Sequence, residues 1–244
     1  MKIAIIGRGN VAFHLEKAIS MADSNHEIVL VNPHSPENSP NDCDVYILAV
    51  SDGAIKEVAD SLPESSGILV HTSGSQPIEI LKSSAFKNYG VFYPLQTFSK
   101  DVALDYSKIV FFIEGKNEQT IKILYKLAQS ISNNVNVADS DLRKRLHIAS
   151  VISCNFVNHM WAISDILLKE NSLSIDVLTP LIEETLRKIK SVSPKDAQTG
   201  PAKRGDTEII ETHVNTLQVS HPDISNLYRI ISNSILSFYD IKNK

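Results

Sequence analysis

Six residues near the N-terminus follow the pattern G-x-G-x-x-A, which is typical of a loop that binds the two phosphates of a dinucleotide. They are Gly7, Arg8, Gly9, Asn10, Val11 and Ala12. The first glycine permits a tight turn, the second lets a pyrophosphate approach the backbone, and the alanine lets the next helix pack near the preceding strand. The unpaired N–H groups at the start of that helix favour an anionic ligand. The alternative is a glycine-rich turn that binds nothing.

The elements on either side of this loop have the order that a dinucleotide site needs. Residues 3–6 (IAII) are wholly apolar, as expected for a strand that is buried on both faces of a parallel sheet. Apolar residues then recur at helical spacing from Val11 to Ile19. Strand, glycine turn and helix together favour a dinucleotide-binding domain.

The whole chain has the pattern of an α/β protein with an N-terminal Rossmann-type domain and an all-α C-terminal domain. The first domain, residues 1–138, is expected to hold a mostly parallel sheet with helices on both faces. Its further strands are predicted at 27–31, 44–50, 67–72, 91–97, 109–113 and 135–137, and its further helices at 54–62 and 119–131. The second domain, residues 139–244, is expected to contain helices at 141–169, 174–190, 207–219 and 224–241.

The end of the second strand bears on the choice between NADP and NAD. A position about 20 residues past the glycine loop usually carries an acid that binds the ribose 2′-hydroxyl of NAD. Here that position is Asn32, which is followed by His34 and Ser35. These side chains can donate hydrogen bonds and would not repel a 2′-phosphate, so the sequence favours NADP over NAD. His34 is otherwise a solvated loop residue.

Polar residues also follow the third and fourth strands, at the edge where open α/β sheets bind ligands. Val50, Ser51 and Asp52 end the third strand, and His71, Thr72 and Ser73 end the fourth. We expect both turns to face the cofactor. Ser51 and Asp52 could equally serve as helix N-caps.

The long helix predicted at 141–169 carries a polar row on an otherwise apolar surface. His147, Val151, Asn155 and His159 are spaced four residues apart, and Arg143 extends the row by one turn. His147 is a candidate proton donor or acceptor because the unperturbed pKa of histidine is about 6.5. Asn155 is a candidate hydrogen-bond donor to a reacting oxygen. Both residues could instead have purely structural partners.

Residues 199–206 (TGPAKRGD) form a loop in which two glycines and a proline surround a basic pair. Arg204 could bind a carboxylate or phosphate through two parallel hydrogen bonds. Asp206 could orient Arg204 or cap the next helix. A solvated surface loop is the alternative.

Composition sets bounds on the function. The chain has 244 residues and a net charge of −4, which gives no reason to expect a nucleic-acid partner. We expect no membrane span and no signal peptide, because no apolar run is long enough and the N-terminus has the pattern of a strand. The two cysteines show neither metal-ligand spacing nor a disulfide framework, so no metal is expected and a cytoplasmic location is favoured.

Taken together, these motifs resemble the 6-phosphogluconate dehydrogenase-like superfamily, which includes ketopantoate and pyrroline-5-carboxylate reductases. The segments GRGNVAFHL, AVSDGAI, HTSGS, FYPLQTF, HIASVISCNF and TGPAKRGD are similar to one family in particular. Its members pair a Rossmann-like NADP-binding domain with a C-terminal helical domain of unknown function, and they are described as oxidoreductases.

The resemblance implies an NADP-linked reductase or dehydrogenase and a homodimer that forms through the helical domain. It places the glycine loop, Ser51 and Asp52 at the cofactor. It places His71, Ser73, His147, Asn155 and Arg204 in the presumed cleft. One departure is the catalytic lysine of the related dehydrogenases, which has no clear counterpart here, since Lys144 lies three residues before His147.

The main hypothesis is an NADP-dependent oxidoreductase that acts on a small, anionic carbonyl, imine or hydroxy compound. In it His147 transfers a proton, Asn155 binds the reacting oxygen and Arg204 holds the anionic group. The rival hypothesis is a non-catalytic NAD(P)-binding sensor that signals through a helical dimer. A methyltransferase fits less well, because Asn32 replaces the acid that commonly binds the ribose of its cofactor.

Overall fold

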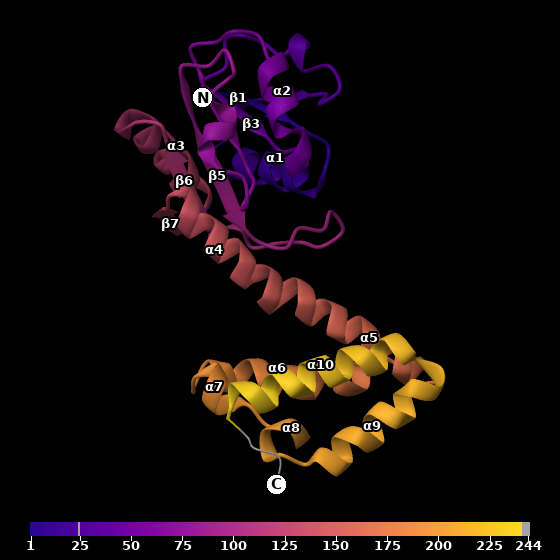
Figure 1. The fold of residues 1–244 in the computed structure, drawn as a ribbon. Coiled ribbons are helices and arrows are strands. Elements are labelled where there is room, and N and C mark those ends of the chain that lie inside the picture. Colours follow the sequence, from indigo (N-terminus) through magenta and orange to yellow (C-terminus); the bar gives the residue numbers. More distant parts are fainter. Residues whose placement is uncertain (24, 241–244) are drawn as a thin grey trace. The chain divides into compact units, whose positions relative to one another are not determined.

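The computed structural model describes residues 1–23 and 25–240, and the chain divides into two compact units (Figure 1). The first unit is Met1–Asn155 and the second is Phe156–Lys244. The division falls inside the predicted long helix rather than at the predicted boundary between residues 138 and 139. The reason is that the first turns of this helix contact the first unit through Arg143 and His147.

The first unit is built on a seven-stranded sheet with the order β2-β1-β3-β4-β5-β6-β7. Every neighbouring pair is parallel except β5 with β6, which is antiparallel. This sheet confirms the predicted fold class. The strands are β1 (Lys2–Ile6), β2 (Glu27–Val31), β3 (Val45–Leu48), β4 (Ile68–His71), β5 (Asn88–Leu95), β6 (Val110–Gly115) and β7 (Asn134–Val137).

Alternating residues of β1 build two separate cores, one on each face of the sheet. Ile3 and Ile5 belong to a cluster with α1 (Asn10–Ala22) and α3 (Glu118–Ile131). Ala4 and Ile6 belong to a second cluster with α2 (Ile55–Ser61). A strand with apolar side chains on both faces buries all of them when helices cover both faces of the sheet. The apolar run at residues 3–6 therefore predicted a buried parallel strand.

A long connection between β5 and β6 lies across the start of α1. The Asn10 side chain donates to the Phe98 carbonyl at 2.8 Å. Both ring nitrogens of the buried His14 are hydrogen-bonded, to the Ser99 carbonyl at 2.8 Å and to the Tyr106 hydroxyl at 3.0 Å. These contacts fix residues 98–106 against the helix that follows the glycine loop.

Short 3₁₀ segments complete the first unit. They are η1 (Pro36–Asn38), η2 (Asp52–Ala54), η3 (Ile78–Leu81) and η4 (Tyr106–Lys108).

The long helix is continuous from Ser140 to Lys169 but is not α-helical throughout. It consists of α4 (Ser140–Ser150), a π-helical segment η5 (Val151–Phe156) and α5 (Val157–Lys169). A π turn has a different rotation per residue from an α-helix. By length and composition alone, this helix could also cross a membrane.

The second unit is helical around a small core of Ala202, Ile210 and Val214. Residues 199–206, expected as a loop, contain a one-turn helix that begins at Pro201, and a second one-turn helix begins at Pro194. Asp206 pairs with Arg204 and makes no side-chain cap to the next helix. The further helices of this unit are η6 (Ile175–Leu178), α6 (Thr179–Ile189), α7 (Pro194–Ala197), α8 (Pro201–Arg204), α9 (Thr207–Ser220) and α10 (Pro222–Phe238).

Candidate functional site

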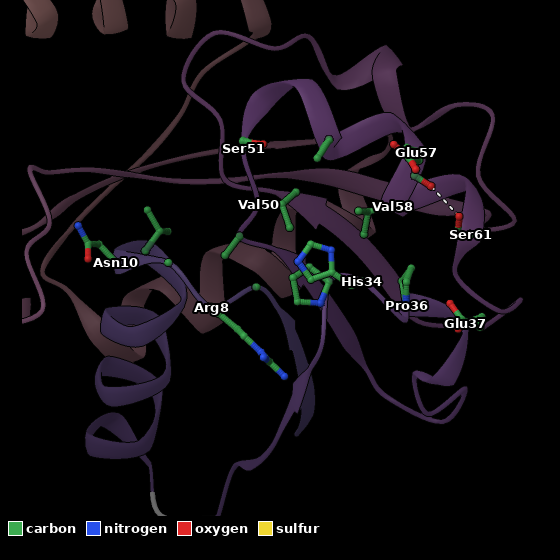
Figure 2. Close-up of a pocket in the computed structure, with 16 residues that line it drawn as sticks. Arg8, Asn10, His34, Pro36, Glu37, Val50, Ser51, Glu57, Val58 and Ser61 are labelled. Carbon is green, nitrogen blue, oxygen red and sulfur yellow. Dashed lines mark hydrogen bonds between the residues drawn. The ribbon is translucent and has the colours of Figure 1, made fainter.

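A cavity of about 700 Å³ opens over the glycine loop at the carboxyl ends of β1 and β3 (Figure 2). The loop after β2 and the residues of η2 and α2 form its other walls. Eight residues predicted to bind a cofactor line it, namely Gly7, Arg8, Gly9, Asn10, Val11, His34, Val50 and Ser51. The size is that of a small-ligand or cofactor site.

The two glycines of the loop have different physical roles. Gly7 has φ +150°, and a Cβ there would lie 2.2 Å from the Ala49 carbonyl oxygen, so no larger residue fits. A Cβ on Gly9 would meet no atom within 4 Å. The protein therefore leaves space above Gly9, as a bound pyrophosphate requires.

The start of α1 is also suited to phosphates. Gly9 is the N-cap residue and provides no side-chain cap, and the first turn contains no acidic residue. The N–H groups at the start of this 13-residue helix are therefore available to an anion at the cavity. The partial positive charge of the helix N-terminus favours the same anion. The residues present therefore fit a dinucleotide.

The loop after β2 forms the far wall of this cavity. The Asn32 side-chain oxygen accepts from the His34 backbone N–H at 3.2 Å, and the Asn32 carbonyl accepts from the Ser35 N–H at 3.0 Å. This turn places His34 in the cavity wall, whereas Ser35 does not line it. In Figure 2, Glu37 and Glu57 lie away from Arg8, so the cationic group and the two carboxylates are separated.

A second cavity of about 340 Å³ adjoins the glycine loop, and Gly7 and Arg8 line both cavities. Ala12 and Asn32, two more residues predicted to bind the cofactor, line this second one. Lys100, from the connection between β5 and β6, also lines it. Arg8 and Lys100 therefore supply two cations at this end of the site.

The loop after β4 is fixed by a chain of hydrogen bonds. The buried His71 accepts a hydrogen bond at Nδ1 from the Ser73 N–H at 3.1 Å. Ser73 Oγ accepts from the N–H groups of Ser75 and Gln76, at 3.1 and 3.0 Å. Ser75 donates to the Asp52 carboxylate. Asp52 thus ties the loop after β4 to the wall of the larger cavity rather than capping a helix.

Burial lowers the pKa of His71 to about 4, and the nearby Arg143 charge lowers it further. His71 is therefore neutral at neutral pH, with its proton on Nε2. The Pro77 backbone opposes this lowering of the pKa, and Nε2 has no hydrogen-bond partner among the described residues. His71 stabilises the loop and is too deeply buried to contact a ligand in the larger cavity. Thr72 is likewise bonded within the sheet, to the Leu48 carbonyl at 3.2 Å.

Beside this loop, Tyr93 and His147 form a hydrogen-bonded pair. The Tyr93 hydroxyl lies 3.2 Å from His147 Nδ1. Gly74 packs so closely that a Cβ there would lie 2.7 Å from His147 Nδ1 and 2.8 Å from the Tyr93 hydroxyl oxygen. Burial raises the pKa of Tyr93. Tyr93 was not among the site residues predicted from the sequence, although an aromatic residue with a polar tip at the ligand-binding edge of a sheet was the available signal.

One turn before His147, the buried Arg143 joins the long helix to the sheet. Its guanidinium contacts the Glu114 carboxylate and the Gln76 carbonyl. Ser140 also donates to Glu114, at 2.9 Å. Arg143 Nε has no partner among the described residues. Arg143 was predicted only to extend the polar row, and the structure shows that it fixes the loop after β4 to the helix.

Neither of the two cavities is lined by Asn155 or Arg204, the remaining predicted residues. Asn155 is exposed in the π-helical segment at the end of the first unit. Arg204 belongs to the second unit, where its guanidinium pairs with Asp206 at 2.8 Å. Residues 1–23 and 25–240 contain no group of three or more side chains suited to a metal.

Comparison with known proteins defines the class of this chain. A family model described as "Domain of unknown function (DUF2520)" matches residues 109–235. A search of curated protein sequences gave no match. A protein from Bacteroides fragilis, described as a candidate NADP oxidoreductase, is 35% identical, with 97% of this chain and 98% of that chain aligned and a TM-score of 0.86. The chain belongs to the DUF2520 family and has a Rossmann-type domain followed by a helical region.

More distant structures share the fold. A Thermotoga maritima protein is 24% identical, with 98% of each chain aligned and a TM-score of 0.69. A Plasmodium falciparum pyrroline carboxylate reductase, solved with NADP bound, is 14% identical, with 97% of this chain and 98% of that chain aligned and a TM-score of 0.62. At these identities the likeness concerns the fold alone.

Proposed function

We propose that this protein is an NADP-dependent oxidoreductase that acts on a small carbonyl, imine or hydroxy compound. The observation that carries the proposal is the cavity over Gly7 and Gly9, which has open space and free N–H groups where a dinucleotide needs them. The relative that is 35% identical over nearly the whole chain supports the same activity.

In this proposal the start of α1 binds the pyrophosphate, and Arg8 binds the 2′-phosphate of NADP. His34 and Val50, which line the same cavity, contact the adenosine. The nicotinamide lies toward the loop after β4, where Asp52 holds Ser75. NADPH, when bound, supplies a hydride to the substrate.

The polar character of the site supports an enzyme rather than a sensor. A sensor needs only a closed wall around the cofactor, whereas proton transfer needs titratable side chains. At the ligand-binding edge of the sheet, Tyr93 and His147 are hydrogen-bonded to each other beside Gly74. Asn155 and Arg204 are the proposed ligands of the reacting oxygen and of an anionic substrate group.

The proposal includes a homodimer formed through the helical residues. Large apolar side chains are exposed along the long helix, on Leu142, Ile148, Ile152, Phe156, Trp161 and Ile166. More follow on α6, at Leu181, Leu186 and Ile189. Exposed apolar side chains of this size favour burial against a second copy. Sedimentation analysis checks this, and a monomer at micromolar concentration would contradict it.

The first experiment is a titration of the purified protein with NADPH and with NADH, followed by the fluorescence of the reduced nicotinamide. Tight binding of NADPH with weak binding of NADH is the expected result. Binding of neither nucleotide would overturn the proposed function, because the cavity over the glycine loop would then serve another ligand.

A further inference from the structure

Tyr93 reaches the ligand-binding edge of the sheet from β5. His71 of β4 pairs in parallel with Val91 of β5, so Tyr93 lies two residues further toward the carboxyl ends of both strands. Its side chain is buried, with 8% of the residue exposed. The burial that raises the pKa of Tyr93 outweighs the nearby Arg143 charge, which lowers it, and Asp52 raises it further. Tyr93 therefore keeps its proton at neutral pH, as a proton donor must.

His147 can replace the proton that Tyr93 loses. Its Nδ1 lies 3.2 Å from the Tyr93 hydroxyl, and the two rings meet edge to face, with centroids 6.2 Å apart. His147 is only half-buried, so its imidazole can exchange protons with solvent. If Nδ1 donates to the tyrosine oxygen, the tyrosine keeps its own proton free to point toward a substrate.

Gly74 and Arg143 hold this pair in place. A Cβ at Gly74 would lie 2.7 Å from both His147 Nδ1 and Tyr93 Cζ, so the loop after β4 can contact the pair only through a glycine. Arg143 lies one turn before His147 and contacts the Gln76 carbonyl of the same loop. The loop after β4, helix α4 and strand β5 are therefore fixed to one another at the Tyr93 hydroxyl.

We propose that Tyr93 is the catalytic proton donor of this enzyme and that His147 is its proton relay, an inference that rests on the proposed function. Reduction of a C=N or C=O bond adds a hydride, which bound NADPH supplies, to the carbon and a proton to the nitrogen or oxygen. Tyr93 gives that proton from its hydroxyl, and the double bond becomes a single bond. The tyrosinate takes a proton from His147 Nδ1, and His147 Nε2 takes one from water.

Charged and titratable side chains surround the pair of Tyr93 and His147. Asp52 and Arg143 act on Tyr93 with opposite signs, and Arg143 is paired with Glu114. His71, the other histidine near this loop, stays neutral because burial lowers its pKa to about 4.

The test compares the wild-type protein with Tyr93→Phe and His147→Ala. The probes are NADPH with 1-pyrroline-5-carboxylate, pyruvate and benzaldehyde, which represent a cyclic imine, a 2-oxo acid and an aldehyde. The matched control is Tyr228→Phe, because Tyr228 forms a Tyr–His hydrogen bond, 2.7 Å from His213, in the second unit. Circular dichroism and the Tm of each variant establish that it is folded.

We expect Tyr93→Phe to lower kcat about 10²–10⁴-fold. Its Kd for NADPH should stay within about twofold of the wild-type value, because Tyr93 does not line the cofactor cavity. His147→Ala should also lower kcat, and added imidazole should restore part of it, since the small molecule can occupy the space that the side chain leaves. A merely structural histidine would not be rescued in this way. Tyr228→Phe should retain the wild-type kcat.

Unchanged kcat in Tyr93→Phe would overturn the assignment of the donor. Lack of rescue by imidazole in a folded, cofactor-binding His147→Ala variant would overturn the relay. A wild-type protein that binds NADPH but reduces none of the probes would overturn this inference while leaving the cofactor site intact. A wild-type protein that does not bind NADPH would overturn the proposed function itself.

Discussion

Lys100 donates a hydrogen bond from its ammonium group to the Arg8 carbonyl oxygen at 2.9 Å, although 92 residues separate the two in the sequence. The contact joins the connection between β5 and β6 to the glycine loop. It also brings a second cation to the cavity that Arg8 and Asn32 line. Glu16 lines that cavity as well, so one carboxylate partly offsets the two cations.

This arrangement predicts how the protein distinguishes NADP from NAD. Arg8→Ala should weaken NADPH binding by about 10–100-fold, since a hydrogen bond to a charged group contributes about 1.5–3 kcal/mol. NADH binding should change much less, because NADH has no 2′-phosphate. Lys100→Ala should also weaken NADPH binding more than NADH binding, but by a smaller factor. In both variants the loss of NADPH affinity should be smaller at high salt.

Fluorescence titration with each nucleotide measures these effects. Lys17→Ala is the control, because Lys17 lies over the Phe13 ring near Lys100 but does not line the cavity. Equal losses of NADPH and NADH affinity in Arg8→Ala would refute the assignment of the 2′-phosphate.

Gly9 gives a second test of the cofactor site. A Cβ there would meet no protein atom within 4 Å, and its φ of −78° is accessible to alanine. Gly9→Ala should therefore leave the free energy of unfolding unchanged or raise it by about 0.4–1 kcal/mol. Nucleotide binding should fall at least about tenfold, because the methyl group takes the place of the pyrophosphate.

Gly53→Ala is the matched control, since a Cβ at Gly53 also meets nothing within 4 Å and Gly53 does not line either cavity. Isothermal titration calorimetry with NADPH compares the two variants. If Gly9→Ala binds as tightly as Gly53→Ala, the pyrophosphate does not lie over Gly9.

The sequence was informative where local pattern decides structure. The apolar run before Gly7, the glycine loop and the helix after it predicted β1, the turn and α1, because strand burial and helix periodicity depend on nearby residues. The mostly parallel sheet followed from the alternation of strands and helices. Arg8, His34 and Ser51 line one cavity, because the carboxyl ends of parallel strands meet at one edge of the sheet.

Contacts between distant segments could not be predicted in this way. Tyr93 and His147 are 54 residues apart, and only the register of β5 and the packing of α4 bring them together. The π-helical segment after Ser150 also has no clear sequence signal. Arg204 was predicted to bind a ligand, and the structure shows its partner in the second unit to be Asp206.

The pair of Arg143 and Glu114 predicts a strong coupling in stability. Arg143 is 1% exposed at its side chain and Glu114 is 15% exposed. Arg143→Met leaves Glu114 without its cation and should cost about 3–5 kcal/mol, as the loss of one partner of a buried pair does. Glu114→Gln should cost a similar amount, because it leaves a buried guanidinium uncompensated.

The double variant Arg143→Met, Glu114→Gln should be less destabilised than the sum of the two single variants, by about 0.5–3 kcal/mol. Urea unfolding of all four proteins measures this coupling. The control cycle uses Lys56→Met and Asp60→Asn, which change an exposed ion pair on α2. Its coupling energy should be no more than about 0.5 kcal/mol. Additive effects at Arg143 and Glu114 would show that the two do not stabilise each other.

His71 predicts a pH dependence of stability with a definite sign. Its pKa falls from 6.5 to about 4 on folding because the imidazole is buried. Above pH 6.5 the side chain is neutral in both states and contributes no pH dependence. As the pH falls below 6.5, the unfolded chain binds a proton that the folded chain does not, so the folded state is progressively destabilised until about pH 4.

The loss expected from this one group is on the order of 3 kcal/mol, from about 1.4 kcal/mol per pKa unit. His71→Gln removes the titration and keeps a polar side chain beside the Ser73 N–H. As the pH falls from 7 to 4.5, the free energy of unfolding of the wild-type protein should therefore decrease more than that of His71→Gln. His34→Gln is the control variant, because His34 is exposed at the wall of the larger cavity. A constant difference between wild type and His71→Gln across this range would mean that His71 is protonated in the folded state, which would require a buried anion or water beside Nε2.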